Sequence, residues 1–352
     1  MGASQIIYIR TDGNADIAGG HIARCVTIAR QIEHLGHKVC FLVSDKDSLS
    51  LLSAQAPDLS VIQLQNAKYN DLDPELEELS ALFAQNPGTI LIDSYFVTKN
   101  YLSQLQTITK TAYLDDLCAF AYPVDLLINY DCFSAEDIRA LKASAYKNVK
   151  HLLLGAGYAP LRPQFCNHQI SVLPEIKNIL VTTGSSDPYH FMPAFCDMAA
   201  KHSGYHFHLI IGALHTDGTE MKAMAKTNAN LHLYEGVTDL MPIMRTCDFA
   251  VSAAGTTLYE LCALGIPTVS FTMADNQISN ASLLDKEEIV PYAGDIRNSL
   301  DETLAAVFGV MDDFANNLQK RKTVHDKMNS LISGDGALQI AKAIVALQSN
   351  PE

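Results

Sequence analysis

The stretch that decides the fold is Asp12–Cys25, which reads D-G-N-A-D-I-A-G-G-H-I-A-R-C. An apolar strand, predicted over Ile6–Ile9, runs into it, and apolar residues at helical spacing leave it from Ile22 onward. Two adjacent glycines and His21 lie between these elements. Unpaired N–H groups and the helix dipole point into such a turn, which is typical of an anion site in an open α/β fold. A proton-transfer group beside an anion site indicates an enzyme.

The length and charge of the chain limit the number of domains and the classes of binding partner to expect. The chain has 352 residues, 48% of them hydrophobic, and a formal net charge of −14. This length predicts two domains. The negative charge argues against nucleic acid and anionic membrane surfaces as partners, because nothing would neutralise phosphates over an extended surface. One bound nucleotide, which needs only a local positive field, is compatible with it.

The cysteine pattern and the N-terminus bear on the compartment. The eight cysteines include no C-x-x-C pair, and most of them lie in apolar runs. We expect buried free thiols in a reducing compartment. The chain moves almost directly from Met1 into a strand containing Arg10, without a signal-peptide pattern, and we expect no 18-residue apolar run. The expected location is therefore cytoplasmic.

Short β-rich runs alternate with helical patterns along the whole chain, which predicts parallel sheets covered on both faces. A Gly- and Pro-containing segment over 155–174 interrupts this pattern and is the expected domain boundary. We expect domains over 1–165 and 166–335, and a final helix over 336–352 that packs back on the first domain. The fold class is α/β, with two Rossmann-like, doubly wound domains and a cleft between them. The predicted strands are Ile6–Ile9, Lys38–Val43, Ser60–Leu64, Thr89–Ile92, Thr111–Leu114, Asp125–Ile128, His151–Leu154, Asn178–Thr183, Phe207–Ile211, Leu231–Tyr234, Asp248–Ser252 and Thr268–Phe271.

Ligands of open α/β sheets bind outside the carboxyl ends of the strands, so the polar residues at those ends are the candidates. In the first domain they are Asp12, His21, Asp93, Ser94, Tyr95, Asp115 and Asp116. Strand-end aspartates also cap helices and turns, and both readings stay open here.

His21 is the candidate base. A helix start disfavours an imidazolium, so the ring is expected to be neutral and able to take a proton. A structural histidine is the alternative. Arg24, three residues on, shares its helix face and could touch a phosphate or pair with a strand-end carboxylate.

A second predicted anion site lies in Val251–Glu260, which reads V-S-A-A-G-T-T-L-Y-E. Gly255 permits a tight turn, and Thr256 and Thr257 begin a helix whose N–H groups could hold a phosphate. Glu260, about one turn on, could accept both hydroxyls of a ribose. An ordinary helix with a solvent-facing Glu260 is the alternative.

Two further turns and one negative observation complete the candidates. Gly184 and Ser185 follow the first strand of the second domain, and Asn276 and Gln277 offer amides for sugar hydroxyls or N-acyl groups, or else cap a helix. No D-x-D or H-x-x-x-H metal motif accompanies either predicted anion site, so we expect no metal and no cofactor.

Together these motifs resemble the UDP-sugar hydrolases of pseudaminic acid biosynthesis, which release UDP from UDP-2,4-diacetamido-2,4,6-trideoxy-β-L-altropyranose. The resemblance runs from Arg10 to the final helix, and it implies the GT-B fold. The motifs, in order, are R-x-D, G-H-x-x-R-C, I-D-S-Y, L-D-D-L, L-L-G-x-x-Y-x-x-L-R-P, T-G-S-S-D-P, S-A-A-G-T-T-x-Y-E and A-D-N-Q.

The resemblance implies roles for individual residues. His21 would activate water, with Tyr95 and Asn276 as further catalytic candidates near the sugar. It also implies substrate binding by Gly20, Arg24, Gly255, Thr256, Thr257, Glu260 and Gln277. From their places at strand ends and turns we expect Asp12, Asp93, Asp115, Gly184 and Ser185 to bind the substrate as well. The implied partners are a UDP-sugar substrate and UDP.

The chain departs from the family pattern in two loops. Ala18 replaces a glycine in Ile17–His21, and Ser185 replaces one in Gly184–Pro188. Both changes bear on which sugar is used. The alternatives are a glycosyltransferase of the same fold, a UDP-sugar 2-epimerase and a non-catalytic nucleotide-sugar-binding protein.

Overall fold

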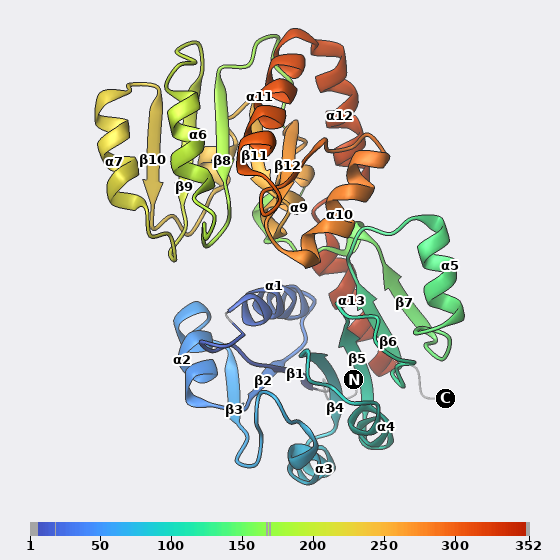
Figure 1. Ribbon diagram of the computed structural model, residues 1–352. Coiled ribbons are helices and arrows are strands. Elements are labelled where there is room, and N and C mark those ends of the chain that lie inside the picture. Colours follow the sequence, from blue (N-terminus) through green and yellow to red (C-terminus); the bar gives the residue numbers. More distant parts are fainter. Residues whose placement is uncertain (1–5, 18, 167, 169, 350–352) are drawn as a thin grey trace. The chain divides into compact units, whose positions relative to one another are not determined.

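The computed structural model describes residues 6–17, 19–166, 168 and 170–349. It divides into two compact units (Figure 1). Unit 1 contains residues 1–163 and 335–352, and unit 2 contains residues 164–334. The chain therefore leaves unit 1 once and returns to it for its last helix.

Unit 1 is built on a seven-stranded parallel sheet in the order β3-β2-β1-β4-β5-β6-β7. Its central strands are apolar and buried on both faces, as parallel sheets between helices require. The strands are β1 (Ile6–Thr11), β2 (Val39–Val43), β3 (Ser60–Gln63), β4 (Gly88–Asp93), β5 (Lys110–Leu114), β6 (Leu126–Asn129) and β7 (His151–Leu154).

Helices cover both faces of this sheet. On one face α1 packs with α13, which also contacts β4, and on the other α3 packs with α4. The helices are α1 (Gly20–His34), α2 (Lys46–Gln55), α3 (Leu76–Gln85), α4 (Lys99–Ile108), α5 (Ala135–Ala143) and α13 (Gly336–Ser349). Short 3₁₀ turns are η1 (Asp73–Glu75) and η2 (Ala156–Tyr158).

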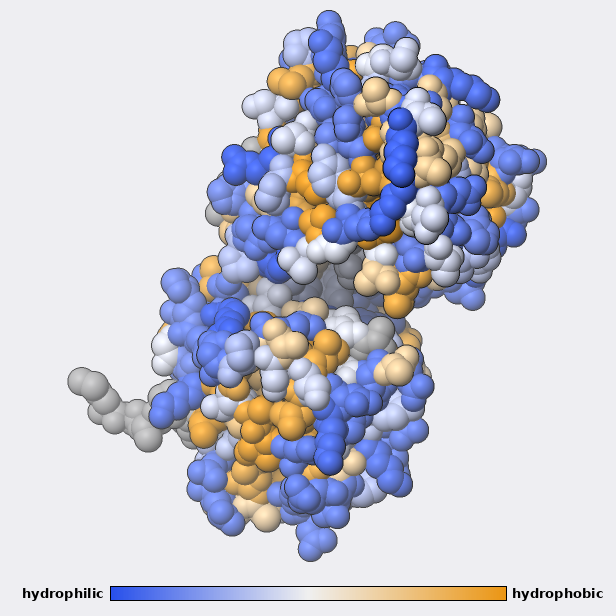
Figure 2. Space-filling view, turned by 90° about the vertical axis from the view of Figure 1, so that its left-hand side faces the viewer, coloured by the Kyte–Doolittle hydropathy of each residue, from blue (hydrophilic) through white to orange (hydrophobic). Residues whose placement is uncertain are grey.

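The edge strand β3 pairs only with β2. Its Ile62 is 37% exposed. Figure 2 views the molecule from the side on which α2 and β3 lie in Figure 1, and it shows hydrophobic residues gathered on this part of unit 1. The β3 edge thus leaves apolar side chains in contact with solvent.

Unit 2 repeats the design with a six-stranded parallel sheet in the order β10-β9-β8-β11-β12-β13. The strands are β8 (Asn178–Thr182), β9 (His206–Ile211), β10 (Leu231–Glu235), β11 (Phe249–Ala253), β12 (Thr268–Thr272) and β13 (Tyr292–Asp295). The 3₁₀ turn η3 (Pro163–Phe165) contains the division between the units. The helices of unit 2 are α6 (Phe191–Ala199), α7 (Gly218–Thr227), α8 (Met241–Met244), α9 (Thr256–Leu264), α10 (Asp275–Lys286), α11 (Leu300–Asn316) and α12 (Leu318–Leu331).

Aromatic contacts tie the helices of unit 2 to its sheet. Phe195 of α6 stacks on Phe308 of α11 at 5.1 Å, and Phe191 stacks on Phe271 of β12 at 4.1 Å. Each sheet places its first strand in the middle, so each has a switch point where the strand order reverses: β1/β4 in unit 1 and β8/β11 in unit 2.

One expectation about apolar runs was wrong. Among the described residues, the stretch Leu318–Gln348 is long and apolar enough, by length and composition alone, to cross a membrane. It consists of two helices, α12 and α13, separated by four residues outside either helix and belonging to different units. A core helix of a folded domain passes the same test, so this is weak support for a membrane span.

Candidate active site

His21 lies at the switch point of unit 1. Thr11 ends β1, Asp93 ends the neighbouring β4, and α1 begins at Gly20, so His21 is the second residue of that helix. Gly19 gives the helix no side-chain cap. Gly20 is exposed, and a Cβ there would meet nothing within 4 Å. The turn before His21 thus leaves room for a ligand to approach.

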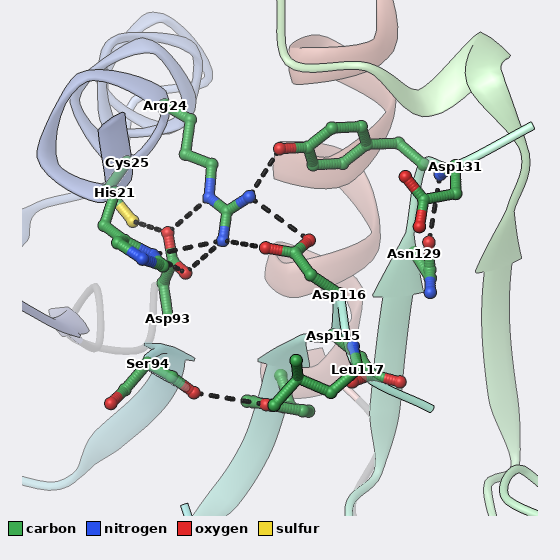
Figure 3. A network of polar contacts seen from close by, with 12 residues as sticks. His21, Arg24, Cys25, Asp93, Ser94, Asp115, Asp116, Leu117, Asn129 and Asp131 are labelled. Carbon is green, nitrogen blue, oxygen red and sulfur yellow. Dashed lines mark hydrogen bonds and ion pairs between the residues drawn. The ribbon is translucent and has the colours of Figure 1, made fainter. Parts of the chain in front are cut away.

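The His21 ring is held by Asp93. Nδ1 lies 2.6 Å from Asp93 Oδ1, and His21 is only 5% exposed (Figure 3). Burial alone raises the pKa of Asp93, but the Arg24 guanidinium and hydrogen bonds from Arg24 and His21 outweigh it and hold that pKa well below its usual range. The carboxylate is therefore ionised and can only accept. Nδ1 also lies 3.1 Å from the Arg24 Nη2 donor, but the carboxylate is the nearer partner, which assigns the imidazole proton to Nδ1. Among the described residues Nε2 has no hydrogen-bonding partner, so its lone pair is available for a proton.

The Arg24 guanidinium donates its hydrogen bonds to other side chains of unit 1. Nε and Nη2 donate to the two oxygens of Asp93 at 2.6 and 2.5 Å. Nη2 and Nη1 donate to Asp116 at 2.8 and 3.2 Å, and Nη1 also donates to the Tyr130 hydroxyl at 2.5 Å. These five hydrogen bonds match the five N–H donors of a guanidinium, and Nη2 in addition lies 3.1 Å from His21 Nδ1. Of the two partners considered for Arg24, a phosphate or a carboxylate, the structure shows the carboxylate.

Tyr95 packs against the candidate base. Its ring meets the His21 ring edge to face, with centroids 4.5 Å apart, and the residue is 43% exposed. Burial, followed by the nearby Asp116 carboxylate, raises the pKa of Tyr95 to about 12. The phenol therefore stays protonated at neutral pH and is a hydrogen-bond donor.

Asp12 and Asp115 bond inside the protein. Asp12 accepts from Arg10 at 2.5 Å and from the backbone N–H and hydroxyl of Ser44. Asp115 accepts from the hydroxyls of Tyr122 and Tyr146, both at 2.8 Å, and from backbone N–H groups of the turn that follows. Asp115 thus caps the turn that follows its strand, the alternative that the sequence left open, whereas Asp12 joins the ends of β1 and β2 through Arg10 and Ser44.

The candidates of unit 2 gather at its own switch point. Gly184 follows β8 with φ +91°, a conformation that favours glycine, and Ser185 next to it is exposed. Gly255 follows the adjacent β11 and precedes α9 without a side-chain cap, so the first N–H groups of that helix lack the partner that an Asp or Ser would supply. Thr256 is exposed and Thr257 half-buried. Glu260 lies in the second turn of α9 and is half-buried.

The amide pair begins the next helix of unit 2. Asn276 is exposed in the first turn of α10, and no side chain caps that helix. Gln277 Oε1 accepts from the Met273 N–H at 3.0 Å. Its Nε2 lies near Gly255, 3.9 Å from where a Cβ would be. Gln277 thus links the loops after β11 and β12.

Tyr130 is the site residue that sequence reasoning missed. It follows β6, so the strand-end rule would have found it, but a lone aromatic residue gave no chemical signal. Ala18 lies outside the described residues. Among those that are described, no group of three His, Cys, Asp or Glu side chains is placed to hold a metal ion.

Comparisons with solved structures establish the fold. MurG of Acinetobacter baumannii superposes with a TM-score of 0.68 over 97% of this chain and 99% of that one, at 12% identity. UGT71G1 of Medicago truncatula in complex with UDP-glucose gives 0.62 over 97% and 98%, also at 12% identity. The fold is GT-B. The expected fold class is confirmed.

Sequence comparisons cover parts of the chain. Residues 178–331 match the model of the glycosyltransferase family 28 C-terminal domain. The uncharacterized protein MJ1062 of Methanocaldococcus jannaschii is 21% identical over 75% of this chain and 54% of its own length. The spore coat polysaccharide biosynthesis protein SpsG of Bacillus subtilis is 22% identical over 53% of this chain and 56% of its own length. The GT-B chain thus spans just over half the length of these curated relatives.

Proposed function

We propose that this chain is an enzyme that uses a nucleotide sugar, with unit 2 holding the nucleotide and unit 1 supplying a base. The match of residues 178–331 to a glycosyltransferase C-terminal domain supports the first part. Similar structures in complex with UDP-glucose and with UDP support it further. The proposed location is cytoplasmic.

The observation that carries the proposal is the His21–Asp93 contact of 2.6 Å. A carboxylate on Nδ1 fixes the tautomer and stabilises the imidazolium that forms when Nε2 takes a proton. In the proposed reaction, water attacks the anomeric carbon opposite the diphosphate. The bond from that carbon to the diphosphate oxygen breaks, UDP leaves with the electron pair, and the water proton passes to His21. A positioned base contributes about 10²–10⁴-fold.

The nucleotide side of the proposal uses the start of α9. The N–H groups and hydroxyls of Thr256 and Thr257 would hold the diphosphate, beside Gly184 and Ser185, and Glu260 would accept from the ribose. Oriented donors of this kind stabilise a leaving group by roughly 3–4 kcal/mol each. We therefore expect turnover to persist in a chelator.

The resemblance to the hydrolases of pseudaminic acid biosynthesis supplies the finer proposal. The substrate would be UDP-2,4-diacetamido-2,4,6-trideoxy-β-L-altropyranose, hydrolysed with inversion to the free sugar and UDP. Tyr95, Asn276 and Gln277 would contact the sugar. The departures at Ala18 and Ser185 lie in loops that this proposal places near it.

A glycosyltransferase is the second candidate, and one observation favours it. Tyr95, Phe96 and Leu117 are 43%, 36% and 49% exposed on the loops that follow β4 and β5. Asp93, the last residue of β4, and Asp116, on the loop after β5, are their neighbours in the sequence. Exposed apolar side chains beside the base would suit an apolar acceptor in place of water.

One experiment separates the candidates. Purified protein is incubated with a panel of UDP-sugars, with and without acceptors, and the release of UDP is measured. UDP release in water alone supports the hydrolase, and release only with an acceptor supports the transferase. His21→Asn should lower turnover by about 10²–10⁴-fold while leaving UDP affinity unchanged. Near wild-type turnover in that variant would overturn the assignment of the base.

A further inference from the structure

The Arg24 cluster consists of His21, Arg24, Asp93, Asp116 and Tyr130. It brings one guanidinium between two carboxylates that come from different strand ends (Figure 3). Asp93 is fully buried and touches both His21 and Arg24, whereas Asp116 touches Arg24 and its side chain is 21% exposed.

The net charge of the Arg24 cluster shows what the Asp116 carboxylate does. Arg24 contributes +1, and Asp93 and Asp116 contribute −1 each, so the cluster carries −1 while His21 is neutral. When His21 takes a proton, the cluster reaches zero. Without Asp116 the charge of Arg24 would cancel that of Asp93, and protonating His21 would create an uncompensated positive charge in a largely buried site.

We propose that Asp116 is a positioning residue that strengthens His21 as a base by neutralising Arg24. Asp116 fixes the second edge of the guanidinium, so Arg24 presents its first edge to Asp93 in the orientation that His21 requires. The proposal deepens the proposed function, because it rests on His21 acting as the base.

Other titratable groups face this cluster from each element packed against it. Tyr95 stacks on His21, and Tyr130 accepts from Arg24. The Cys25 thiol donates to Asp93 Oδ2 at 3.4 Å. Burial, followed by the Asp93 carboxylate, raises the pKa of this thiol, and burial also raises the pKa of Tyr95 and Tyr130. All three remain neutral at pH 5–8, so the carboxylates, Arg24 and His21 set the charge there.

The test is Asp116→Asn, which keeps the shape of the side chain and removes its charge. The His21 ring is followed by ¹⁵N-detected NMR over pH 4–9 and assigned by its loss in His21→Asn. We expect the titration midpoint of the His21 ring to fall by roughly half a pH unit or more, since an anion near the ring has been removed. The acidic limb of kcat/KM should shift in the same direction, and kcat should fall several-fold at pH 7.

Two further variants distinguish positioning from general damage. Asp58→Asn removes a carboxylate from a similar two-contact pair, with Arg30 at 2.6 Å, on the surface of the same unit. It should leave the His21 titration unchanged. Arg24→Met removes the cation instead, so the midpoint should rise, opposite in sign to Asp116→Asn.

The outcomes separate this proposal from the proposed function. A His21 midpoint in Asp116→Asn within 0.2 units of wild type (about the precision of such a titration) overturns the role of Asp116, even if UDP-sugars are hydrolysed. A lowered midpoint in Asp116→Asn with a raised one in Arg24→Met supports it, even if no UDP-sugar tested turns over. The same shift in Asp58→Asn would also overturn it.

Discussion

At the residue scale, Asp93 is the point where three side chains of one helix converge. His21, Arg24 and Cys25 all lie in the first two turns of α1, and each contacts this carboxylate. The spacing i, i+3, i+4 brings them to one helix face. The G-H-x-x-R-C motif therefore has a structural reason, which is that one buried anion needs its donors from one helix.

Replacing that anion should cost both rate and stability. In Asp93→Asn the His21 ring loses the charged acceptor that fixes its proton on Nδ1 and stabilises the imidazolium, and we expect turnover to fall about 10²-fold or more. Arg24 loses a buried partner, so the free energy of unfolding should fall by about 3–5 kcal/mol. UDP release and chemical denaturation measure the two effects. Asp58→Asn, at a largely exposed pair, should change stability by less than about 1 kcal/mol.

The sequence predicted which side chains meet at this edge but not how they bond. Asp93, Asp115 and Asp116 follow neighbouring strands, so the rule for parallel sheets was enough to place them. The pairing of Arg24 with Asp93, Asp116 and Tyr130 joins residues 69, 92 and 106 positions apart. No local pattern encodes which of several carboxylates an arginine will reach, so its partner stayed open until the coordinates decided it.

At the element scale, two loops of unit 2 approach each other so closely at Gly212 that no larger residue fits there without a shift of the backbone. A Cβ on Gly212, just after β9, would lie 2.3 Å from the carbonyl oxygen of Gly184. Gly309 lies exposed in the middle of α11, where a Cβ would meet nothing. The two positions therefore differ in what an added methyl group must displace.

Replacing these two glycines by alanine should change the free energy of unfolding in opposite directions. Gly212→Ala should lower the free energy of unfolding by about 1–3 kcal/mol, because backbone must move, and the displaced Gly184 turn should also weaken UDP binding. Gly309→Ala should raise it by about 0.5–1 kcal/mol, since glycine is a poor helix former. Denaturation curves of the two variants test both signs. A neutral Gly212→Ala would mean that the loops do not approach this closely.

Three histidines lie close together on β9 and β10 of unit 2. His206 lies 3.1 Å from His232 between ring nitrogens, and His208 bonds to Tyr234 and Asn178. Burial, followed by the neighbouring histidines, lowers the pKa of His208 and His232, and for His208 the Asp248 carboxylate opposes this. As pH falls through the ordinary histidine value of 6.5, the unfolded chain takes up protons first, so stability present above that pH is lost below it.

We expect the thermal unfolding temperature of unit 2 to be lower at pH 5.5 than at pH 7.5. His232→Gln should reduce this fall by removing one of the interacting rings. His190 has the opposite effect on stability, because its hydrogen bond to Asp217 raises its pKa. The quantity to compare is therefore the drop in unfolding temperature of His232→Gln with that of the wild type. An equal fall in both proteins would show that the cluster does not cause it.

Strands were easier to predict than the last helices of unit 2. Every predicted strand is present within two residues at each end, because buried parallel strands read as short apolar runs. Several helices of unit 2, α12 among them, and the strand β13 were not predicted. The sequence of α12, L-Q-K-R-K-T-V-H-D-K-M-N-S-L, is too polar for a clear apolar stripe, and β13 is only four residues long and half-buried. Both are held by packing on neighbours.

At the scale of the whole molecule, unit 1 depends on a distant part of the chain. Ile340, Ala341 and Ile344 of α13 are fully buried, and this helix packs on α1, the helix that carries His21. The final helix was expected on the first domain, and the division into units includes residues 335–352 in unit 1. The expected boundary at residue 165 lies two residues from that division.

Ile344→Ala should therefore destabilise unit 1, although most of that unit lies far from Ile344 in the sequence. We expect a loss of about 2–5 kcal/mol, typical of a buried isoleucine, confined to unit 1. Hydrogen exchange read by mass spectrometry reports the two units separately. Ile62→Ala, at an exposed position of the same unit, should change stability by less than about 1 kcal/mol. Faster exchange throughout residues 164–334 would contradict this division.

The return of α13 to unit 1 also sets an order of events on the ribosome. Residues 164–334 form one continuous segment, so unit 2 has all of its parts as soon as they have emerged. Unit 1 emerges first but lacks the helix that covers α1 until residues 336–349 have been synthesised. The nascent protein would thus finish its second half before its first, and His21 would reach its final surroundings only after the nucleotide-binding half of the proposed enzyme is complete.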